Sequence, residues 1–292
     1  MYKYLSFFIF IFISASSFAA NSNVNYEPIP CTVDNGLITN TRGFGNDPNP
    51  EPLCDFQANS VKLNVYKFAL CTQEPIFNQS STPTNLSSCT YIYDSATPTL
   101  VTVSNSSGLN ISDVTQPAAG TYPYALVIMS NTLYVKGAAH FDGTRIADLG
   151  STSGAYCWTN GSVLSADSDN NPIMQLVSGN GVTCGNTVGG NYDFNQVTWT
   201  WSTWPGSIYT EDVPNGRNTD YFLNDSLIGT GTKTRWASVH RFDSPVTITP
   251  TTSAIEMAVN ISLGTSIRFN NSTGKVKWIE DAPFAYIIRP VN

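Results

Sequence analysis

Charge is scarce in this sequence. Its 292 residues include 14 Lys or Arg and 21 Asp or Glu, so charged side chains make up 12% of the chain, against about 25% in ordinary soluble domains. The net charge of −7 and the pI of about 4.7 argue against a nucleic-acid partner, which requires a basic surface. Apolar residues still account for 41%, which is enough for a sizeable core and excludes wholesale disorder.

Long hydrophobic runs are absent after residue 20. Lys3 precedes an apolar run over residues 5–13, and small residues up to Ala20 offer a cleavage site, which predicts a signal peptide over residues 1–20. The alternative, an uncleaved anchor, is disfavoured because the run is too short to cross a bilayer. No later run approaches the length of about 18 apolar residues that a span needs. We therefore expect a protein of the periplasm, the cell surface or the extracellular space, with no membrane span after cleavage.

Cysteine spacing typical of metal sites is also missing. The sequence has no C-x-x-C pair, and its histidines, His140 and His240, are far from any cysteine. In an exported chain an even number of cysteines indicates disulfides, although six cysteines allow fifteen pairings. Pairing in sequence order is the simplest, and each bridge then contributes about 3 kcal/mol in the loop-entropy model. Pairing in sequence order joins Cys31 to Cys54, Cys71 to Cys89 and Cys157 to Cys184.

Helical periodicity is missing as well, and apolar residues recur instead at every second position. Strict alternation over residues 255–263 predicts a half-buried strand. Residues 121–129 are apolar on both faces, which is typical of a central strand that is covered on both sides. A change of parity between Val65 and Tyr66 predicts a bulge, or a strand whose halves face different layers. Apolar alternation on both sides of residues 270–274 predicts a hairpin.

These short strands are interrupted by glycine, proline and asparagine, which favours antiparallel sheets over a parallel one. The predicted fold class is an all-β, disulfide-stapled antiparallel β-sandwich with little helix, built as one large or two smaller sandwiches. After the signal peptide we expect a loop-rich N-terminal segment over residues 21–56 and a first β-sandwich region over 57–149. A second β-rich region follows over 150–292, with a Gly-rich excursion over 150–190.

Two short motifs lie at the starts of predicted strands. Residues 119–122 read Ala-Gly-Thr-Tyr and lead into an apolar strand, and residues 245–248 read Pro-Val-Thr-Ile shortly before the strand at 255–263. Over about a third of the mature chain, these segments resemble the prealbumin-like β-sandwich domains that bacteria export. The resemblance implies an extracytoplasmic sandwich and brings no catalytic residue with it. The cysteine-rich N-terminal region and the Trp-rich middle depart from the pattern.

Residues with catalytic potential are few. His140 and His240 are each followed closely by an aspartate, and such a pair could orient a general base. No G-x-S-x-G elbow occurs, because Thr152 stands where the nucleophile would be, and H-E-x-x-H is absent. We therefore predict no enzymatic activity, and a secreted hydrolase based on either histidine is an alternative.

One acidic stretch resembles the start of a calcium loop. Asp167, Asp169 and Asn171 place oxygen ligands at alternate positions. Pro172 stands where an EF-hand needs glycine, and Ser178 where it needs glutamate. A polar turn is the simpler interpretation, with calcium in another geometry as the alternative. We predict no other cofactor.

Three tryptophans form the sharpest local feature. Trp199 and Trp201 fall on one face of a predicted strand, and Trp204 follows them. Flat indole rings in a row could stack on sugars, which suggests a carbohydrate-binding module. Large alternating apolar residues on a strand are more often core, and Val197 continues the same face.

The leading functional hypothesis is an exported, non-enzymatic β-sandwich protein with a structural or adhesive role at the cell surface or in an extracellular assembly. Charged side chains normally protect the edges of sheets, and this chain has few of them. We therefore expect self-association or attachment to a surface polymer through strand addition. The N-terminal arm and the strand over residues 284–288 are the expected donors. A carbohydrate-binding module and a secreted hydrolase remain the alternatives.

Overall fold

Strands are the regular elements of this structure. The computed structural model describes residues 24–26, 30–40, 42–43, 52–77, 84–104, 114–167, 175–178, 181–200, 208–213, 215–229, 231–270, 273–281 and 284–291. These residues contain the strands β1 to β21 and no helix, so the predicted all-β fold class, with mostly antiparallel pairing, is confirmed. Accordingly, the described part of the chain has no apolar helix of membrane-spanning length.

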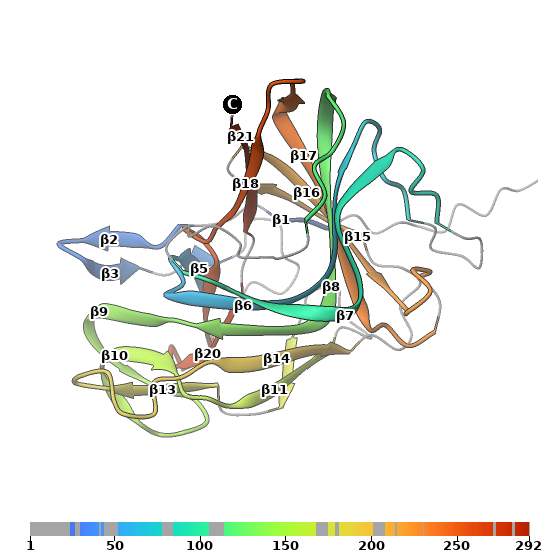
Figure 1. Cartoon of the computed structure of the whole chain (residues 1–292). Coiled ribbons are helices and arrows are strands. Elements are labelled where there is room, and N and C mark those ends of the chain that lie inside the picture. Colours follow the sequence, from blue (N-terminus) through green and yellow to red (C-terminus); the bar gives the residue numbers. More distant parts are fainter. Residues whose placement is uncertain are drawn as a thin grey trace, which may run out of the picture.

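The largest sheet has 10 strands and runs through the middle of the molecule (Figure 1). Its main path is β1-β15-β16-β17-β8-β14-β11-β12, while β6 pairs with the other side of β8 and β7 pairs with β6. The strands are β1 (Val24–Tyr26), β6 (Ser60–Cys71), β7 (Cys89–Val103), β8 (Gly120–Lys136), β11 (Val163–Asp167), β12 (Gln175–Ser178), β14 (Asn195–Thr200), β15 (Ile208–Val213), β16 (Gly216–Leu223) and β17 (Arg235–Ile248). This sheet combines strands from both predicted β regions, so the expected boundary between residues 149 and 150 does not separate two sheets.

The central strand β8 changes its neighbour partway along. Residues 120–130 pair with β17, and residues 132–135 pair with β14 on the same edge. On the opposite edge, β6 accompanies both parts. β8 therefore extends from the upper part of the molecule, beside β17, into the lower part, beside β14 (Figure 1). The double cover predicted for residues 121–129 is confirmed, because Val127 and Met129 face one core while Leu126 and Ile128 face another.

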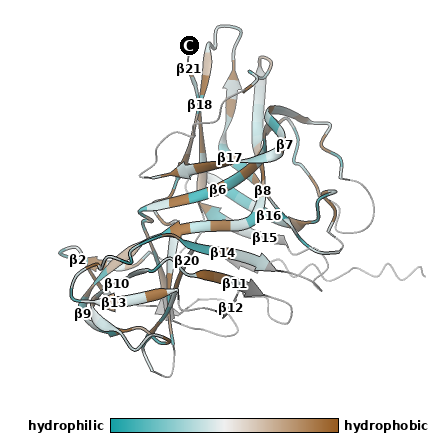
Figure 2. Ribbon diagram, turned by 60° about the horizontal axis from the view of Figure 1, so that its bottom comes forward, coloured by the Kyte–Doolittle hydropathy of each residue, from teal (hydrophilic) through white to brown (hydrophobic). Residues whose placement is uncertain are grey.

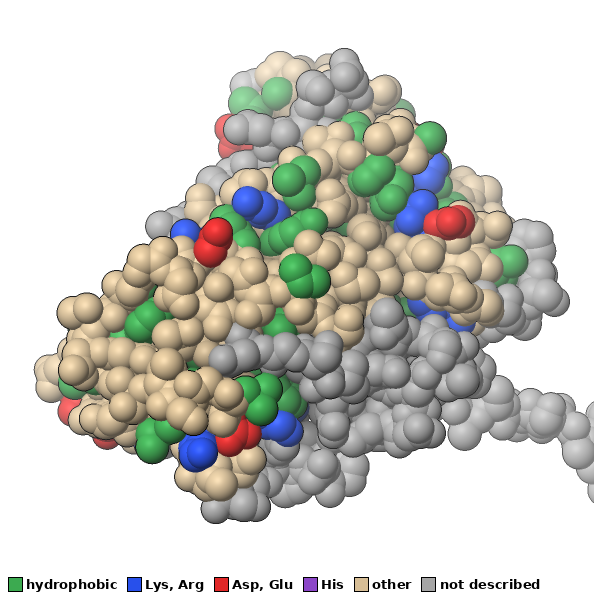
Figure 3. Space-filling model, turned by 90° about the horizontal axis from the view of Figure 1, so that it is seen from below, with side chains coloured by type: hydrophobic (Ala, Val, Ile, Leu, Met, Phe, Trp, Pro, Cys, Tyr) green, Lys and Arg blue, Asp and Glu red, His purple; other side chains and the backbone are tan. Residues whose placement is uncertain are grey.

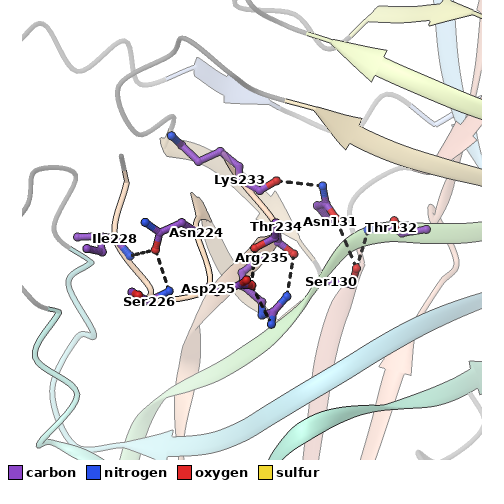
Figure 4. A network of polar contacts seen from close by, with 10 residues as sticks. All are labelled: Ser130, Asn131, Thr132, Asn224, Asp225, Ser226, Ile228, Lys233, Thr234 and Arg235. Atoms are coloured by element: carbon purple, nitrogen blue, oxygen red, sulfur yellow. Dashed lines mark hydrogen bonds and ion pairs between the residues drawn. The ribbon is translucent and has the colours of Figure 1, made fainter. Parts of the chain in front are cut away.

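Asn131 lies where β14 replaces β17 as the neighbour of β8. Its backbone N–H donates to the Thr234 carbonyl at 3.2 Å. Its side-chain amide donates to the Lys233 carbonyl at 3.1 Å, and a second polar link runs from the Thr234 hydroxyl to Asp225 at 2.6 Å (Figure 4). Asp225 also pairs with Arg235 at 2.9 Å. The backbone N–H of Asn131 and the carbonyls of Lys233 and Thr234 therefore have hydrogen-bond partners at the point where β8 changes its neighbour, as buried backbone groups require.

The change of parity in the sequence of β6 corresponds to a shift in its pairing register. Its register shifts between Val65 and Lys67 against both β7 and β8. After the shift, Phe68 and Leu70 face the same core as Val65, although they are of opposite parity to it. Of the two predicted explanations, the bulge is therefore right, since it adds a residue that restores the apolar face.

A second layer covers one face of the main sheet. β18 (Ala254–Asn260) and β21 (Ala285–Val291) form an antiparallel pair above β16 and β17. Met257, Val259 and Tyr286 enter the largest buried cluster, together with Phe222 and Trp236 of the main sheet. Burying a side chain of this size contributes about 1.5–3 kcal/mol, so this interface is a major source of stability. Hydrophobic and hydrophilic segments alternate along the strands, as a sandwich requires (Figure 2).

The lower part of the molecule has its own core. It joins the sheet β13-β10-β9-β3-β2 to the sheet β20-β19-β5-β4 around Phe141, Ile267 and Val276. The predicted hairpin around residues 270–274 is confirmed by the pairing of β19 with β20. β5 pairs with β19, so the N-terminal segment expected to be rich in loops contributes strands here. The strands are β2 (Thr32–Asp34), β3 (Leu37–Asn40), β4 (Arg42–Gly43), β5 (Pro52–Phe56), β9 (Ala138–Ile146), β10 (Ser153–Thr159), β13 (Val182–Gly185), β19 (Thr265–Phe269) and β20 (Val276–Asp281).

The three disulfides follow the order of the sequence, as predicted. One fastens the N-terminal segment to β5, and the others join directly opposed residues of β6 and β7 and of β10 and β13. Bridges of this kind indicate an oxidising, extracytoplasmic environment. They are Cys31–Cys54, Cys71–Cys89 and Cys157–Cys184.

Candidate functional site

The tryptophan predicted to lead a sugar-binding face lies in the core. Trp199 is 1% exposed and packs in the same cluster as Val197 and Leu133. The prediction that Trp199 is a core residue is therefore right. The alternative, in which its indole ring is exposed and stacks on a sugar, is wrong. Trp201 and Trp204 lie outside the described residues.

The acidic stretch proposed for calcium is described only at its start. Asp167 ends β11, where its backbone pairs with Thr200 of β14 and Gln175 of β12. Asp169 and Asn171 lie outside the described residues, so calcium binding stays a prediction. Across the described ranges, no three His, Cys, Asp or Glu side chains gather closely enough to hold a metal ion.

His140 contacts an aromatic ring, and no described carboxylate forms an ion pair with it. It lies on β9, opposite Tyr156 of β10, and the two rings stack with centroids 3.9 Å apart and planes 9° from parallel. The nearby carboxylate of Asp142 is directed to Arg145, at 3.4 Å. The His–Asp pair suggested by the sequence is therefore not assembled at this position.

His240 belongs to a buried polar cluster between the main sheet and β21. Its side chain is 0% exposed, and its Nδ1 lies 2.7 Å from Oδ1 of Asn218 on the neighbouring strand. The Asn218 amide nitrogen donates to the Phe284 carbonyl at 2.9 Å. The Asn218 oxygen therefore accepts from His240, which places the proton of the neutral imidazole on Nδ1.

Burial controls the charge of this histidine. Desolvation lowers the pKa of His240 to about 4, while the Asn215 carbonyl and the Asp243 carboxylate act in the opposite direction. The imidazole is consequently neutral at neutral pH. A hydrolase needs a carboxylate and a hydroxyl that converge on one accessible histidine, whereas His240 is enclosed and bonded to an amide.

Asp220 lies beside this pair, opposite Ser238 on β17. Desolvation raises the pKa of its carboxyl to about 6, although hydrogen bonds with Ser238 and Trp236 oppose the rise. Asn218 and Asp220 share one side of β16 with Phe222, which packs in one buried cluster with Met257 and Tyr286 of the second layer, so both polar pairs lie under that layer. The four side chains of this cluster, His240, Asn218, Asp220 and Ser238, are all buried. Their hydrogen bonds connect the two layers inside the protein, which favours a structural role over a binding site.

β7 lies at an edge of the main sheet. Among the described strands it pairs only with β6, and Thr115 bonds to its first half through the Ile92 carbonyl at 2.7 Å. The strand bulges between Asp94 and Thr99, because these residues face positions 67 and 65 of β6. From Thr99 to Val103 the strand is regular and uncharged, and no other described backbone hydrogen-bonds to it.

A pair of lysines lies over aromatic rings on the outer face of the main sheet. Nζ of Lys62 is 3.8 Å from the ring centre of Phe194, and Nζ of Lys136 is 4.4 Å from that of Tyr192 and 5.6 Å from that of Phe194. Neither ammonium has an ion-pair partner among the described carboxylates. This group was not among the sites predicted from the sequence, although both lysines interrupt runs of alternating apolar residues at outward positions, which was the available signal.

Comparison with known proteins provides no relative for this chain. No family model matches it, and no curated protein and no solved structure matches it either. The resemblance to prealbumin-like domains therefore stays a prediction.

Proposed function

We propose that the protein is an exported, non-enzymatic component of an extracellular or cell-surface assembly, in which the β7 edge of one copy pairs with the β7 edge of another. Three disulfides in an all-β fold support an extracellular location. The observation that carries the proposal is the uncharged edge from Thr99 to Val103, to which no other described backbone segment hydrogen-bonds.

The chemistry of this edge favours strand addition. Natural edge strands are commonly blocked by lysine, proline or a bulge, and a flat edge without them tends to pair with another strand. The bulge and Pro98 precede Thr99, and β7 has one charged residue, Asp94, which is already paired with Lys67. Val101 and Val103 are anchored in the core, which holds the strand in register.

A second copy is the occupant that this edge suits best. Two identical edges can meet in antiparallel order about a two-fold axis, which gives a closed dimer in which each edge satisfies the other. The main sheets of both copies then become continuous. Few charged side chains are visible over the face drawn in Figure 3, and the segment from Thr99 to Val103 contains none, so the edge itself adds no charge repulsion to such contacts.

Size-exclusion chromatography with light scattering tests this function. We expect the mature protein to dimerise with increasing concentration and Leu100→Lys to remain monomeric, because Leu100 lies on the edge and is 52% exposed. Leu149→Lys is the matched control, since Leu149 is 65% exposed but lies in a turn, and this variant should dimerise normally. A monomeric wild type, or a folded Leu100→Lys variant that still dimerises, would overturn the proposal.

A further inference from the structure

The outer face that carries the lysines extends across several strands. Lys62, Tyr134 and Gln196 stand opposite one another on β6, β8 and β14 and form one cross-strand row. In the next row, the hydroxyls of Thr132 and Thr198 are 3.0 Å apart. Adjacent strands are about 4.8 Å apart, so the face repeats its polar groups at short, regular intervals.

The charges on this face are unusual for the chain. The protein carries a net charge of −7, yet Lys62 and Lys136 both approach the Phe194 ring without a described carboxylate beside them. The nearest acidic residue in sequence, Asp193, turns its carboxylate to the backbone N–H of Phe194 at 2.7 Å. Two like charges are thus held near one ring, and each retains its capacity to bind an anion.

We propose that this face, defined by Lys62, Tyr134, Lys136, Phe194 and Gln196, binds an acidic polysaccharide. Carboxylates along the polymer complement the ammonium groups, and the C–H faces of sugar rings pack against aromatic rings. The side-chain amide of Gln196 and the threonine hydroxyls of the next row supply donors and acceptors for sugar hydroxyls.

The alternative anionic ligands fit this face less well. A nucleic acid requires many basic contacts, whereas this face offers two lysines. A membrane surface attracts clusters of several lysines and an apolar insertion, whereas these positions form a polar sheet face. A glycan needs few charges and many hydroxyl contacts, which is what the two rows offer. The site adjoins the β7 edge, because Lys62 stands opposite Thr102 of β7, but its defining residues lie on other strands and in the loop before β14, and binding does not require dimerisation.

Affinity electrophoresis of the intact protein in gels containing polygalacturonate tests this site. We expect retardation in polygalacturonate, none in neutral dextran, and loss of retardation near 1 M salt, where the Debye length falls to about 3 Å. Lys62→Gln and Lys136→Gln should each weaken binding by about threefold to tenfold, as expected for charge contacts that water partly screens. Phe194→Ala should weaken it as well, because the ring positions both ammonium groups.

Lys67→Gln provides the matched control. Lys67 also lies on β6 and over an aromatic ring, with Nζ 5.1 Å from the centre of Tyr91, but it is already paired with Asp94. This variant should bind as the wild type does, and circular dichroism should show that all the variants are folded. Equal loss in Lys67→Gln, equal retardation in dextran, or binding to phosphatidylglycerol vesicles in place of the polymer would each overturn the proposal.

Discussion

The side-chain amide of Asn131 donates a hydrogen bond to the backbone carbonyl of Trp199 at 2.8 Å. The same nitrogen also donates to the carbonyl of Lys233, so one side chain joins the end of β14 to the residues just before β17. These strands share one edge of β8, and Asn131 occupies the only position between their pairings with it. A continuous sheet in this region therefore depends on an asparagine that belongs to neither strand.

Replacement of Asn131 by alanine should destabilise the protein by about 1–3 kcal/mol, because two half-buried carbonyls lose their donor. Urea unfolding monitored by tryptophan fluorescence gives the free energy directly. Asn186→Ala is the control, since Asn186 is exposed in a loop, and a change there should stay within about 0.5 kcal/mol. Equal stability of Asn131→Ala and the wild type would contradict the bridging role.

A second prediction concerns the close approach of β10 and β13. A Cβ on Gly154 would overlap the backbone of Gly185, and the Cys157–Cys184 bridge holds the same strands together. Gly154→Ala should therefore cost about 2 kcal/mol or more, since neither strand can move away. Gly143→Ala should be neutral by comparison, because no other atom lies within 4 Å of the place that its Cβ would occupy. Thermal unfolding of both variants provides the measurement, and similar midpoints would contradict this packing.

Local features of this fold were predictable from the sequence. The order of the cysteines predicted all three bridges, and the parity change after Val65 predicted a bulge in β6. Alternation around residues 270–274 predicted a hairpin for the same reason, because both strands and the turn lie in one short segment. Such features need no information from the rest of the chain.

Long-range pairing was not predictable in this way. β5 pairs with β19 from the opposite end of the chain, and the local pattern of neither strand specifies the other. Alternation also placed Trp199 on one face of a strand without showing which face the rest of the molecule covers. The lysine site was not predictable for the same reason, because the contact between Lys62 and Phe194 depends on the long-range pairing that places β8 between β6 and β14.

Two buried groups should give the stability of this protein opposing responses to pH. Burial lowers the pKa of His240 from its ordinary 6.5 to about 4, so between these values only the unfolded chain holds the proton and stability rises with pH. Burial raises the pKa of Asp220 from 3.8 to about 6, so only the folded chain holds that proton and stability falls as pH rises. In the wild type these contributions oppose each other between about pH 4 and pH 6.

Substitution of one group should reveal the response of the other. Relative to the wild type, His240→Gln should lose stability as pH rises from 4 to 6, because Asp220 then acts alone. Asp220→Asn should gain stability over the same interval, because His240 then acts alone. Each slope is limited to about 1.4 kcal/mol per pH unit, the value for a single proton. Urea unfolding at half-unit steps measures both slopes, and slopes of the same sign would show that at least one of these groups does not titrate as its burial requires.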